Sequence, residues 1–168
     1  LRGHVHQERQ TPLVVFAPKQ GLRMKQTRTH IDLLASGSFQ EVLDDPGVVD
    51  PSAVTRVVFC SGKVAWDAMA ERNKRGSPVA IVRVEQLYPL PTDQMLELLQ
   101  TRYPNASELR WLQEEPENMG AWSFIEHRTW RVKEQGYDLQ HIARVESGSP
   151  ATGSKTVHDQ ELADLMDE

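Results

Sequence analysis

Several features that define common protein classes are scarce or missing in this chain. It holds one cysteine in 168 residues, which excludes an internal disulfide framework and a cysteine-rich zinc site. No apolar run approaches the roughly 18 residues that a membrane-spanning helix needs, and no signal peptide is recognisable. The first residue is Leu1 rather than methionine, so we expect a piece of a longer protein. The lone Cys60 lies in an apolar run, which favours a buried, unreactive thiol over a nucleophile.

Positive charge is also scarce in most of the chain. Apolar residues make up 39% and charged residues 26%, which is enough for one core and too apolar for a disordered chain. Residues 1–40 hold six Lys or Arg against two Asp or Glu, a net charge of +4, whereas residues 41–168 hold thirteen against twenty-two, a net charge of −9. Because phosphate contacts need a dense basic face, the acidic body argues against nucleic acid as the main partner. The basic N-terminal arm could bind phosphates or an acidic neighbour, although simple solvation is favoured.

From Val54 onward, apolar runs alternate with amphipathic stretches. The pattern predicts a mainly parallel sheet with helices on both faces, because strand and helix alternate four times. Ser61, Thr92 and the pair Thr156 with Asp159 are expected to cap three of the helices. The predicted strands are residues 54–60, 79–84, 109–112 and 139–145, and the predicted helices are residues 64–73, 92–103, 122–135 and 156–168.

The first 53 residues have no such pattern. Residues 13–16 form a short apolar run bounded by Pro12 and Pro18, which suggests a strand. Residues 19–53 scatter glycine and proline among polar residues and indicate an irregular connection with a helical turn near residues 30–34. A connection this long is unusual inside a compact domain, so we interpret it as a linker that crosses a neighbouring domain.

Ser61, Gly62 and Lys63 stand between a predicted strand and a predicted helix, where anions often bind. A nucleotide-hydrolysing phosphate loop is excluded, because that motif needs Gly at position 57 and Ser or Thr at position 64, and both positions are Val. Two interpretations remain open: a weak anion site, or a serine cap and a glycine turn without ligand. The second is favoured.

Glu114 and Glu115 follow the third predicted strand, where ligands bind in open α/β sheets. The two carboxylates could act as acid and base, or they could face a domain interface. We favour the interface, because side chains alternate along a strand and need not converge on one reacting atom. No metal site is predicted, since His4 and His6 lack helical ligand spacing and no HExxH motif is present. The hydroxyl-rich residues 149–154 have no nucleophile motif.

Five segments, in order and with matching spacing, resemble one family. The ordered set is specific, although each motif alone is weak. The segments are residues 11–19 with 22–23, 59–63, 81–91, 113–122, and 149–154 with 157–158. Together they resemble the C-terminal region of the thiamine-diphosphate-dependent decarboxylating component of 2-oxoglutarate dehydrogenase, a family that includes the actinobacterial multifunctional 2-oxoglutarate metabolism enzymes.

The resemblance implies a transketolase C-terminal-domain-like, three-layer α/β sandwich, in which a mostly parallel five-stranded sheet has helices on both faces. It implies that residues 1–18 end an upstream pyrimidine-binding domain, that residues 19–53 are the linker and that residues 54–168 are the transketolase-type C-terminal domain. The contact surface of this domain is expected at six residues of the fourth motif: Glu114, Glu115, Pro116, Asn118, Gly120 and Trp122.

The resemblance also implies the role of the parent protein. In this family a homodimer decarboxylates 2-oxoglutarate on thiamine diphosphate and Mg²⁺ in the tricarboxylic acid cycle. It then passes the succinyl group to a lipoyl-bearing succinyltransferase component. The Gly-Asp-Gly metal motif and the catalytic residues of the family lie upstream, so we expect both cofactors outside this chain and no activity from the chain alone. A bacterial cytoplasmic location is expected, with no membrane or nucleic-acid partner.

Actinobacterial members of the family bind the activator acetyl-CoA on this domain, and the matching positions differ here. Gln86 matches, but Ser38, Glu41, Asp93 and Gln94 stand where that branch has Lys, Ser, Arg and Arg. Because CoA phosphates need positive partners, we predict weak or absent activation by acetyl-CoA. The alternative function is a stand-alone regulatory module that binds a nucleotide or CoA-type anion at Ser61, Gly62 and Lys63 with Gln86 nearby.

Overall fold

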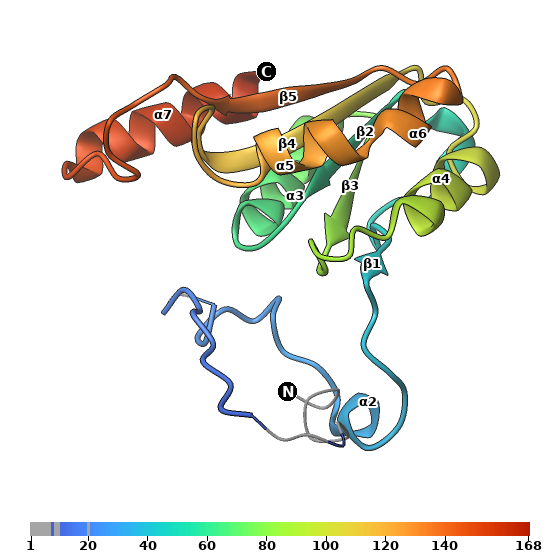
Figure 1. Cartoon of the computed structure of the whole chain (residues 1–168), viewed down its shortest axis with the longest axis horizontal. Coiled ribbons are helices and arrows are strands. Elements are labelled where there is room, and N and C mark those ends of the chain that lie inside the picture. The colour runs from blue at the N-terminus through green and yellow to red at the C-terminus, as the bar shows by residue number, and fades with distance from the viewer. Residues whose placement is uncertain (1–7, 9–10, 20) are drawn as a thin grey trace. The chain divides into compact units, whose positions relative to one another are not determined.

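The structure, a computed structural model, describes residues 8, 11–19 and 21–168 (Figure 1). The chain divides into two compact units, Leu1–Gln40 and Glu41–Glu168. His4 and His6, considered above as metal ligands, lie outside the described residues, as do residues 1–7, 9 and 10 of the predicted end of the upstream domain.

In the N-terminal unit, the apolar run at residues 13–16 forms no strand, so that prediction is wrong. Its side chains are exposed, with Phe16 at 94%, and a β-strand needs a neighbouring strand to receive its backbone hydrogen bonds. The predicted helical turn is confirmed as α2 (Ile31–Ala35). His30 caps this turn, because its Nδ1 accepts a hydrogen bond from the backbone N–H of Asp32 at 3.4 Å.

The second unit is built on one five-stranded sheet with the order β1-β3-β2-β4-β5. Strands β2 to β5 run parallel, and β1 pairs with β3 in the antiparallel direction. The predicted mostly parallel, five-stranded sheet is therefore confirmed. The strands are β1 (Val42–Leu43), β2 (Arg56–Cys60), β3 (Val79–Val84), β4 (Glu108–Pro116) and β5 (Leu139–Arg144).

The sequence pattern does not predict β1. This strand and the short 3-10 helix η1 (Pro51–Ala53) lie among the residues that we assigned to the linker, and the compact unit begins at Glu41 rather than Val54. Two residues are too few to show the alternation that identifies a strand. What fixes this segment is tertiary: the carboxylate of Asp45, a residue that is 1% exposed, accepts hydrogen bonds at 2.8 Å from Arg72 Nη1 and from the Ile81 backbone N–H.

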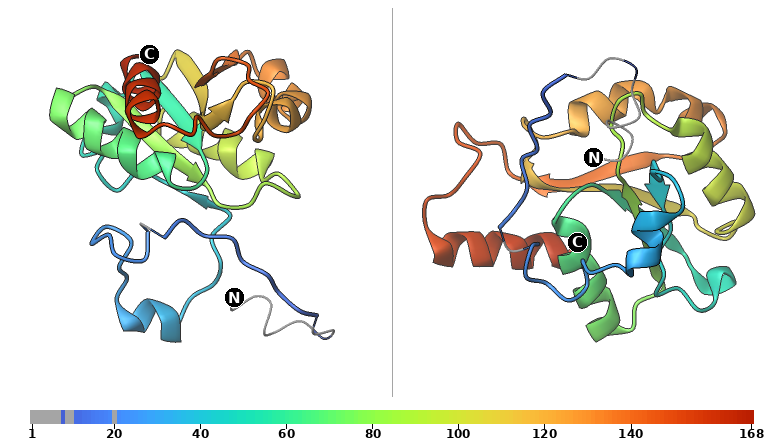
Figure 2. Two further views of the ribbon diagram at one scale, coloured as in Figure 1. Left: turned by 90° about the vertical axis from the view of Figure 1, so that its left-hand side faces the viewer. Right: turned by 90° about the horizontal axis from the view of Figure 1, so that it is seen from below.

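Helices cover both faces of the sheet, which confirms the three-layer sandwich (Figures 1 and 2). One hydrophobic cluster joins the sheet to α4, α5 and α6, and a second cluster joins the opposite face to α3 and α7. The helices are α3 (Val64–Arg75), α4 (Thr92–Thr101), α5 (Trp122–Arg128), α6 (Trp130–Glu134) and α7 (Lys155–Asp167).

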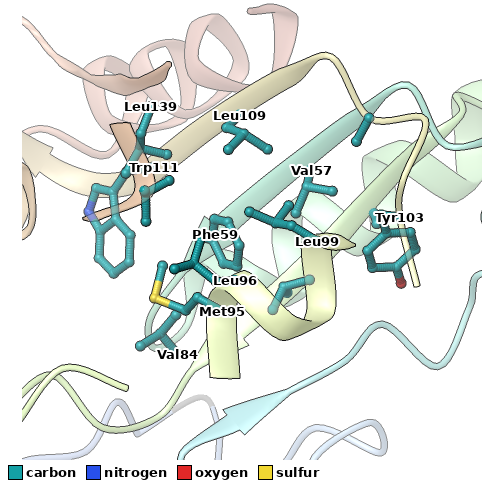
Figure 3. Packing of buried hydrophobic residues seen from close by; sticks show 14 of the residues in the cluster. Val57, Phe59, Val84, Met95, Leu96, Leu99, Tyr103, Leu109, Trp111 and Leu139 are labelled. Carbon is teal, nitrogen blue, oxygen red and sulfur yellow. The ribbon is translucent and has the colours of Figure 1, made fainter. Parts of the chain in front are cut away.

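The central strand β2 shows how the apolar run divides between these two clusters. Val57 and Phe59 enter the first cluster, while Val58 and Cys60 enter the second, because successive side chains of a strand point to opposite faces. Figure 3 shows the first cluster, in which Trp111 and Tyr103 are the two largest fully buried side chains. Cys60 is 0% exposed and burial raises its pKa to about 12, so the predicted inert thiol is confirmed.

Three local predictions need correction. None of the helices α3, α4 and α7 has a side-chain cap from Ser61, Thr92 or Thr156, because they begin after Lys63, Pro91 and Ser154. The long helix expected at residues 122–135 is divided into α5 and α6. At the division, the buried Thr129 donates its hydroxyl to the backbone oxygens of Ile125 and Glu126 at 3.0 and 3.3 Å. Such side-chain bonds compete with the helical ladder. Strand β4 extends beyond the expected Leu112 to Pro116, with an irregular register between the two.

Candidate functional site

The carboxyl ends of the parallel strands meet at one edge of the sheet, and three of them face a pocket there. From β2 the chain leads to the neighbour on one side, β3, and from β4 it leads to the neighbour on the other side, β5. This reversal is a topological switch point, where ligands bind in open α/β sheets. The pocket has a volume of about 500 Å³ and is lined by Ser61, Gly62, Leu87, Tyr88, Trp111, Leu112, Gln113, Glu115, Gly120, Ala121 and Phe124.

The candidate anion site at Ser61, Gly62 and Lys63 is only partly at this pocket. Ser61 and Gly62 line it, whereas Lys63 is directed to carboxylates: its Nζ lies 2.5 Å from Asp67 and 3.6 Å from Glu114. Burial alone would lower the pKa of Lys63, but the hydrogen bonds and charges of the two carboxylates outweigh burial and raise that pKa. The ammonium group is therefore charged and already compensated, which weakens its attraction for an anion.

Gln86 lies with a different set of residues. Its Nε2 donates to the backbone oxygen of Pro89 at 2.9 Å and to Glu41 Oε1 at 3.4 Å. The other oxygen of Glu41 accepts a hydrogen bond from Gln94 at 2.5 Å. Three of the positions compared above with the acetyl-CoA-binding branch thus come together around one carboxylate.

Asp93, a fourth compared position, pairs with Arg131 at 2.5 Å. This contact neutralises a nearby arginine that could otherwise have met a phosphate group. The fifth position, Ser38, belongs to the N-terminal unit.

Glu114 and Glu115 do not converge on one point. Glu114 faces Lys63 and lies 3.8 Å from His158 Nε2, whereas Glu115 is exposed and lines the pocket. This divergence follows from the alternation of side chains along β4. An acid–base pair acting on one atom is therefore disfavoured by the geometry.

The turn after β4 is organised by Gln113, a residue that sequence reasoning did not single out. Its side chain is buried, with the residue 3% exposed. Its Nε2 donates to the backbone oxygens of Pro116 and Met119 at 3.0 and 2.8 Å, and its Oε1 accepts the backbone N–H groups of Ala121 and Trp122 at 3.1 and 2.9 Å. One side chain thereby closes the turn and satisfies the first N–H groups of α5. The sequence signals are its place just before a predicted turn and at the start of the fourth motif.

Gly120 is required at its position for two reasons. Its φ of +68° favours glycine, and a Cβ atom there would lie 3.0 Å from the Gln113 amide and from the Glu115 Cβ. The glycine in the fourth motif is therefore explained by a close approach to Gln113.

The other members of the predicted contact surface have mixed positions. Pro116 is buried at the end of β4, and Trp122 is 8% exposed and stacks on His141 at a ring distance of 4.6 Å. Asn118 is exposed, and its amide group exchanges two hydrogen bonds with the Ser147 backbone at 3.0 and 3.1 Å. Of the six predicted residues, the side chains of Glu115 and Asn118 thus remain the most accessible.

Within residues 8, 11–19 and 21–168, no group of three or more His, Cys, Asp or Glu side chains could hold a metal ion. No helix in the same part of the chain is long and apolar enough to cross a membrane.

The fold and the pocket define a three-layer α/β domain with a hollow at the switch point of its parallel sheet. The family model described as 2-oxoglutarate dehydrogenase C-terminal matches residues 28–168, and the chain therefore belongs to that family. It is 38% identical over 170 residues to the 2-oxoglutarate dehydrogenase E1 component of Azotobacter vinelandii, which covers 99% of this chain and 18% of that protein. It is 41% identical over 172 residues to the mitochondrial 2-oxoglutarate dehydrogenase of Caenorhabditis elegans, covering 99% of this chain and 16% of that protein. The Exiguobacterium E1 component is 37% identical over 161 residues, covering 94% of this chain and 17% of that protein.

The chain thus spans about a sixth of the length of the curated relatives it matches. The first of the five motifs that carried the resemblance lies in the N-terminal unit. The other four fall on the ends of β2, β3 and β4, on the segments that follow them, and on the segment that leads into α7 and its first turn.

Proposed function

We propose that this chain is the C-terminal domain of a 2-oxoglutarate dehydrogenase decarboxylating component, and that it stabilises the larger body that carries the active site. The observation that carries the proposal is the family match over residues 28–168, in a chain that spans about a sixth of relatives with this activity. The parent would be a homodimer that decarboxylates 2-oxoglutarate and passes the succinyl group to a lipoyl-bearing partner.

Thiamine diphosphate and Mg²⁺ would be held by other parts of the parent. The described residues do not fit a metal site, since they contain no suitable cluster of ligands. When bound, thiamine diphosphate stabilises the carbanion that forms on loss of carbon dioxide. The part proposed for this chain is structural: it buries an apolar core of its own and presents the carboxyl edge of its sheet to neighbouring domains.

The alternative, a stand-alone module that binds a CoA-type or nucleotide anion, has less support. The side chain of Lys63 is compensated by Asp67 and Glu114, and Gln86 is engaged by Glu41 and Pro89. Neither group is free to attract a phosphate.

The test compares three proteins: the full-length parent, the parent truncated after Gln40, and the present chain alone. The measurement is 2-oxoglutarate-dependent reduction of ferricyanide, an artificial electron acceptor, together with molar mass by light scattering. We expect activity and a dimer for the full-length parent, loss of both on truncation, and no activity for the chain alone. A full-length parent that does not oxidise 2-oxoglutarate, or a truncated one with full activity, would contradict the proposal.

A further inference from the structure

The pocket at the switch point contains polar groups that have no partner in the described part of the chain. Trp111 lines the pocket and is 1% exposed, and its indole Nε1 has no hydrogen-bond acceptor among the described residues. A buried N–H group in that condition is rare in native proteins and destabilising. The indole N–H is therefore a donor at the pocket whose acceptor does not lie among the described residues.

Glu115, at the exposed side of the pocket, is a second polar group without a partner among the described residues. Its carboxylate has no hydrogen bond or ion pair within the described residues, although the acidic side chains on either side of it, Glu114 and Glu117, are paired with Lys63, His158 and His141. Residues 41–168 carry a net charge of −9. The charge at this position therefore selects a positive partner and disfavours an anion.

The walls between these two groups are apolar and partly aromatic. Leu87 and Phe124 are half-buried, and Tyr88 is 76% exposed with its ring edge-on to Phe124 at a centroid distance of 6.3 Å. An exposed aromatic ring at the mouth of a hollow is typical of an interface position. Such walls suit the aliphatic stem of Lys or Arg, which packs on apolar surface while its charged end reaches a carboxylate.

We propose that this pocket is a docking site for a basic peptide segment from the part of the parent polypeptide that precedes residue 1. A backbone carbonyl of that segment accepts the Trp111 indole N–H, its Lys or Arg side chain pairs with Glu115, and its aliphatic stem packs against Leu87 and Tyr88. The Phe124 ring is already covered by the chain's own Arg128 guanidinium, 3.7 Å from the ring centroid. The inference rests on the proposed function, because it requires the chain to be part of a longer protein.

A segment of the same polypeptide is favoured over a separate partner. About five-sixths of the length of the relatives lies outside this chain, and a covalently linked segment has an effective concentration in the millimolar range, which a free partner rarely reaches. The volume of about 500 Å³ also admits one or two side chains rather than a whole secondary-structure element.

The experiment places a photo-crosslinker in the pocket of the full-length protein. Tyr88 is replaced by p-benzoylphenylalanine, a change that its exposure allows. After irradiation, the products are resolved on a denaturing gel and mapped by mass spectrometry. We expect a crosslink at monomer mass that joins position 88 to a peptide preceding residue 1 and containing Lys or Arg.

Charge reversal supplies the specificity control. Glu115→Lys should reduce the crosslink yield at least about tenfold, because like charges across an interface repel strongly. The matched variant Glu97→Lys, at an exposed position of α4 outside the pocket, should leave the yield unchanged. Circular dichroism of both variants confirms that they fold.

Several outcomes would overturn the inference: no crosslink, a crosslink confined to residues 41–168, a product at dimer mass, a product with a different protein, or a yield unaffected by Glu115→Lys. In each of these cases the full-length protein would still oxidise 2-oxoglutarate if the proposed function is correct. Absence of that activity would instead count against the proposed function.

Discussion

Gln113 is the residue on which the geometry after β4 most depends. It bonds the backbone on both sides of the turn, at Pro116 and Met119 through its nitrogen and at Ala121 and Trp122 through its oxygen. A buried amide that satisfies four backbone groups cannot be replaced by a shorter side chain without leaving some of them unpaired.

Replacement of Gln113 by alanine should lower the free energy of unfolding by about 2–4 kcal/mol, since each unsatisfied buried polar group costs about 1–3 kcal/mol. Urea denaturation followed by tryptophan fluorescence measures the change. Gln100→Ala, at an exposed position of α4, is the matched control and should shift the free energy by less than about 0.5 kcal/mol. Equal effects of the two variants would show that the Gln113 network is unimportant.

The buried Cys60 thiol should make the domain less stable as the pH rises into the alkaline range. Burial raises its pKa from the ordinary 9.0 to about 12. Because the folded pKa is the higher one, the stabilisation is fully present below pH 9 and is lost as the pH rises toward 12. Tyr103 acts in the same direction, since burial and the Asp44 carboxylate raise its pKa as well.

We therefore expect Cys60 to contribute about 1.4 kcal/mol per pH unit to the fall in unfolding free energy above pH 9. Urea denaturation at pH 8 and pH 10 measures it in the natural chain and in Cys60→Ala. Cys60→Ala should be less stable than the natural chain at both pH values. Its unfolding free energy should, however, fall less between pH 8 and pH 10, because the variant lacks the thiol that titrates. An unchanged difference would place the titrating group elsewhere.

At the scale of elements, the segment of residues 41–53 belongs with the sheet. Asp45 joins it to α3 and β3 through Arg72 and Ile81, and Asp44 joins it to the end of α4 through its pairing with the C-cap residue Arg102. The Asp45–Arg72 pair is buried, with side-chain exposures of 0% and 9%. Removal of one partner of such a pair leaves an uncompensated buried charge.

Asp45→Ala should accordingly destabilise the domain by about 3–5 kcal/mol. Thermal and urea denaturation both measure this loss. The variant Asp164→Ala, on the exposed surface of α7, should remain within about 0.5 kcal/mol of the natural chain. A domain that begins at Glu41 should be as stable as the whole chain, whereas one that begins at Val54 should be less stable. If the domain that begins at Val54 were equally stable, residues 41–53 would have to be assigned to the linker.

At the scale of the whole molecule, the charges around Gln86 bear on regulation of the parent. Glu41 accepts hydrogen bonds from both Gln86 and Gln94, and Asp93 pairs with Arg131. A CoA pyrophosphate placed here would meet carboxylates instead of the arginines that phosphate recognition uses.

We expect the full-length enzyme to show less than about twofold activation by acetyl-CoA at micromolar concentrations. The measurement is the rate of 2-oxoglutarate oxidation during titration with acetyl-CoA. The variant that combines Glu41→Ser with Asp93→Arg and Gln94→Arg introduces the residues that the activated branch has at these three positions, and its activity should respond more strongly to acetyl-CoA. Strong activation of the natural enzyme would contradict the prediction.

The sequence by itself determined the class of fold and the family. Buried strands at 54–60 and 79–84 and amphipathic helices between them are local periodic patterns, and periodicity reports which face of an element is buried. The ordered motifs, likewise, are properties of the linear chain. The weak points were elements without periodicity, such as β1, and the division of one predicted helix at Thr129.

Only the tertiary structure decided the site. The roles of Gln113, Trp111 and Glu115 depend on which groups lie next to them at the switch point of the sheet. The linear sequence does not show which of their polar atoms has a hydrogen-bond partner. The exclusion of Lys63 from an anion-binding role is decided in the same way, because the carboxylate of Glu114 reaches it from a strand about fifty residues further along the chain. Hydrogen bonding and charge compensation depend on distances in space, whereas strand and helix depend on neighbours in sequence.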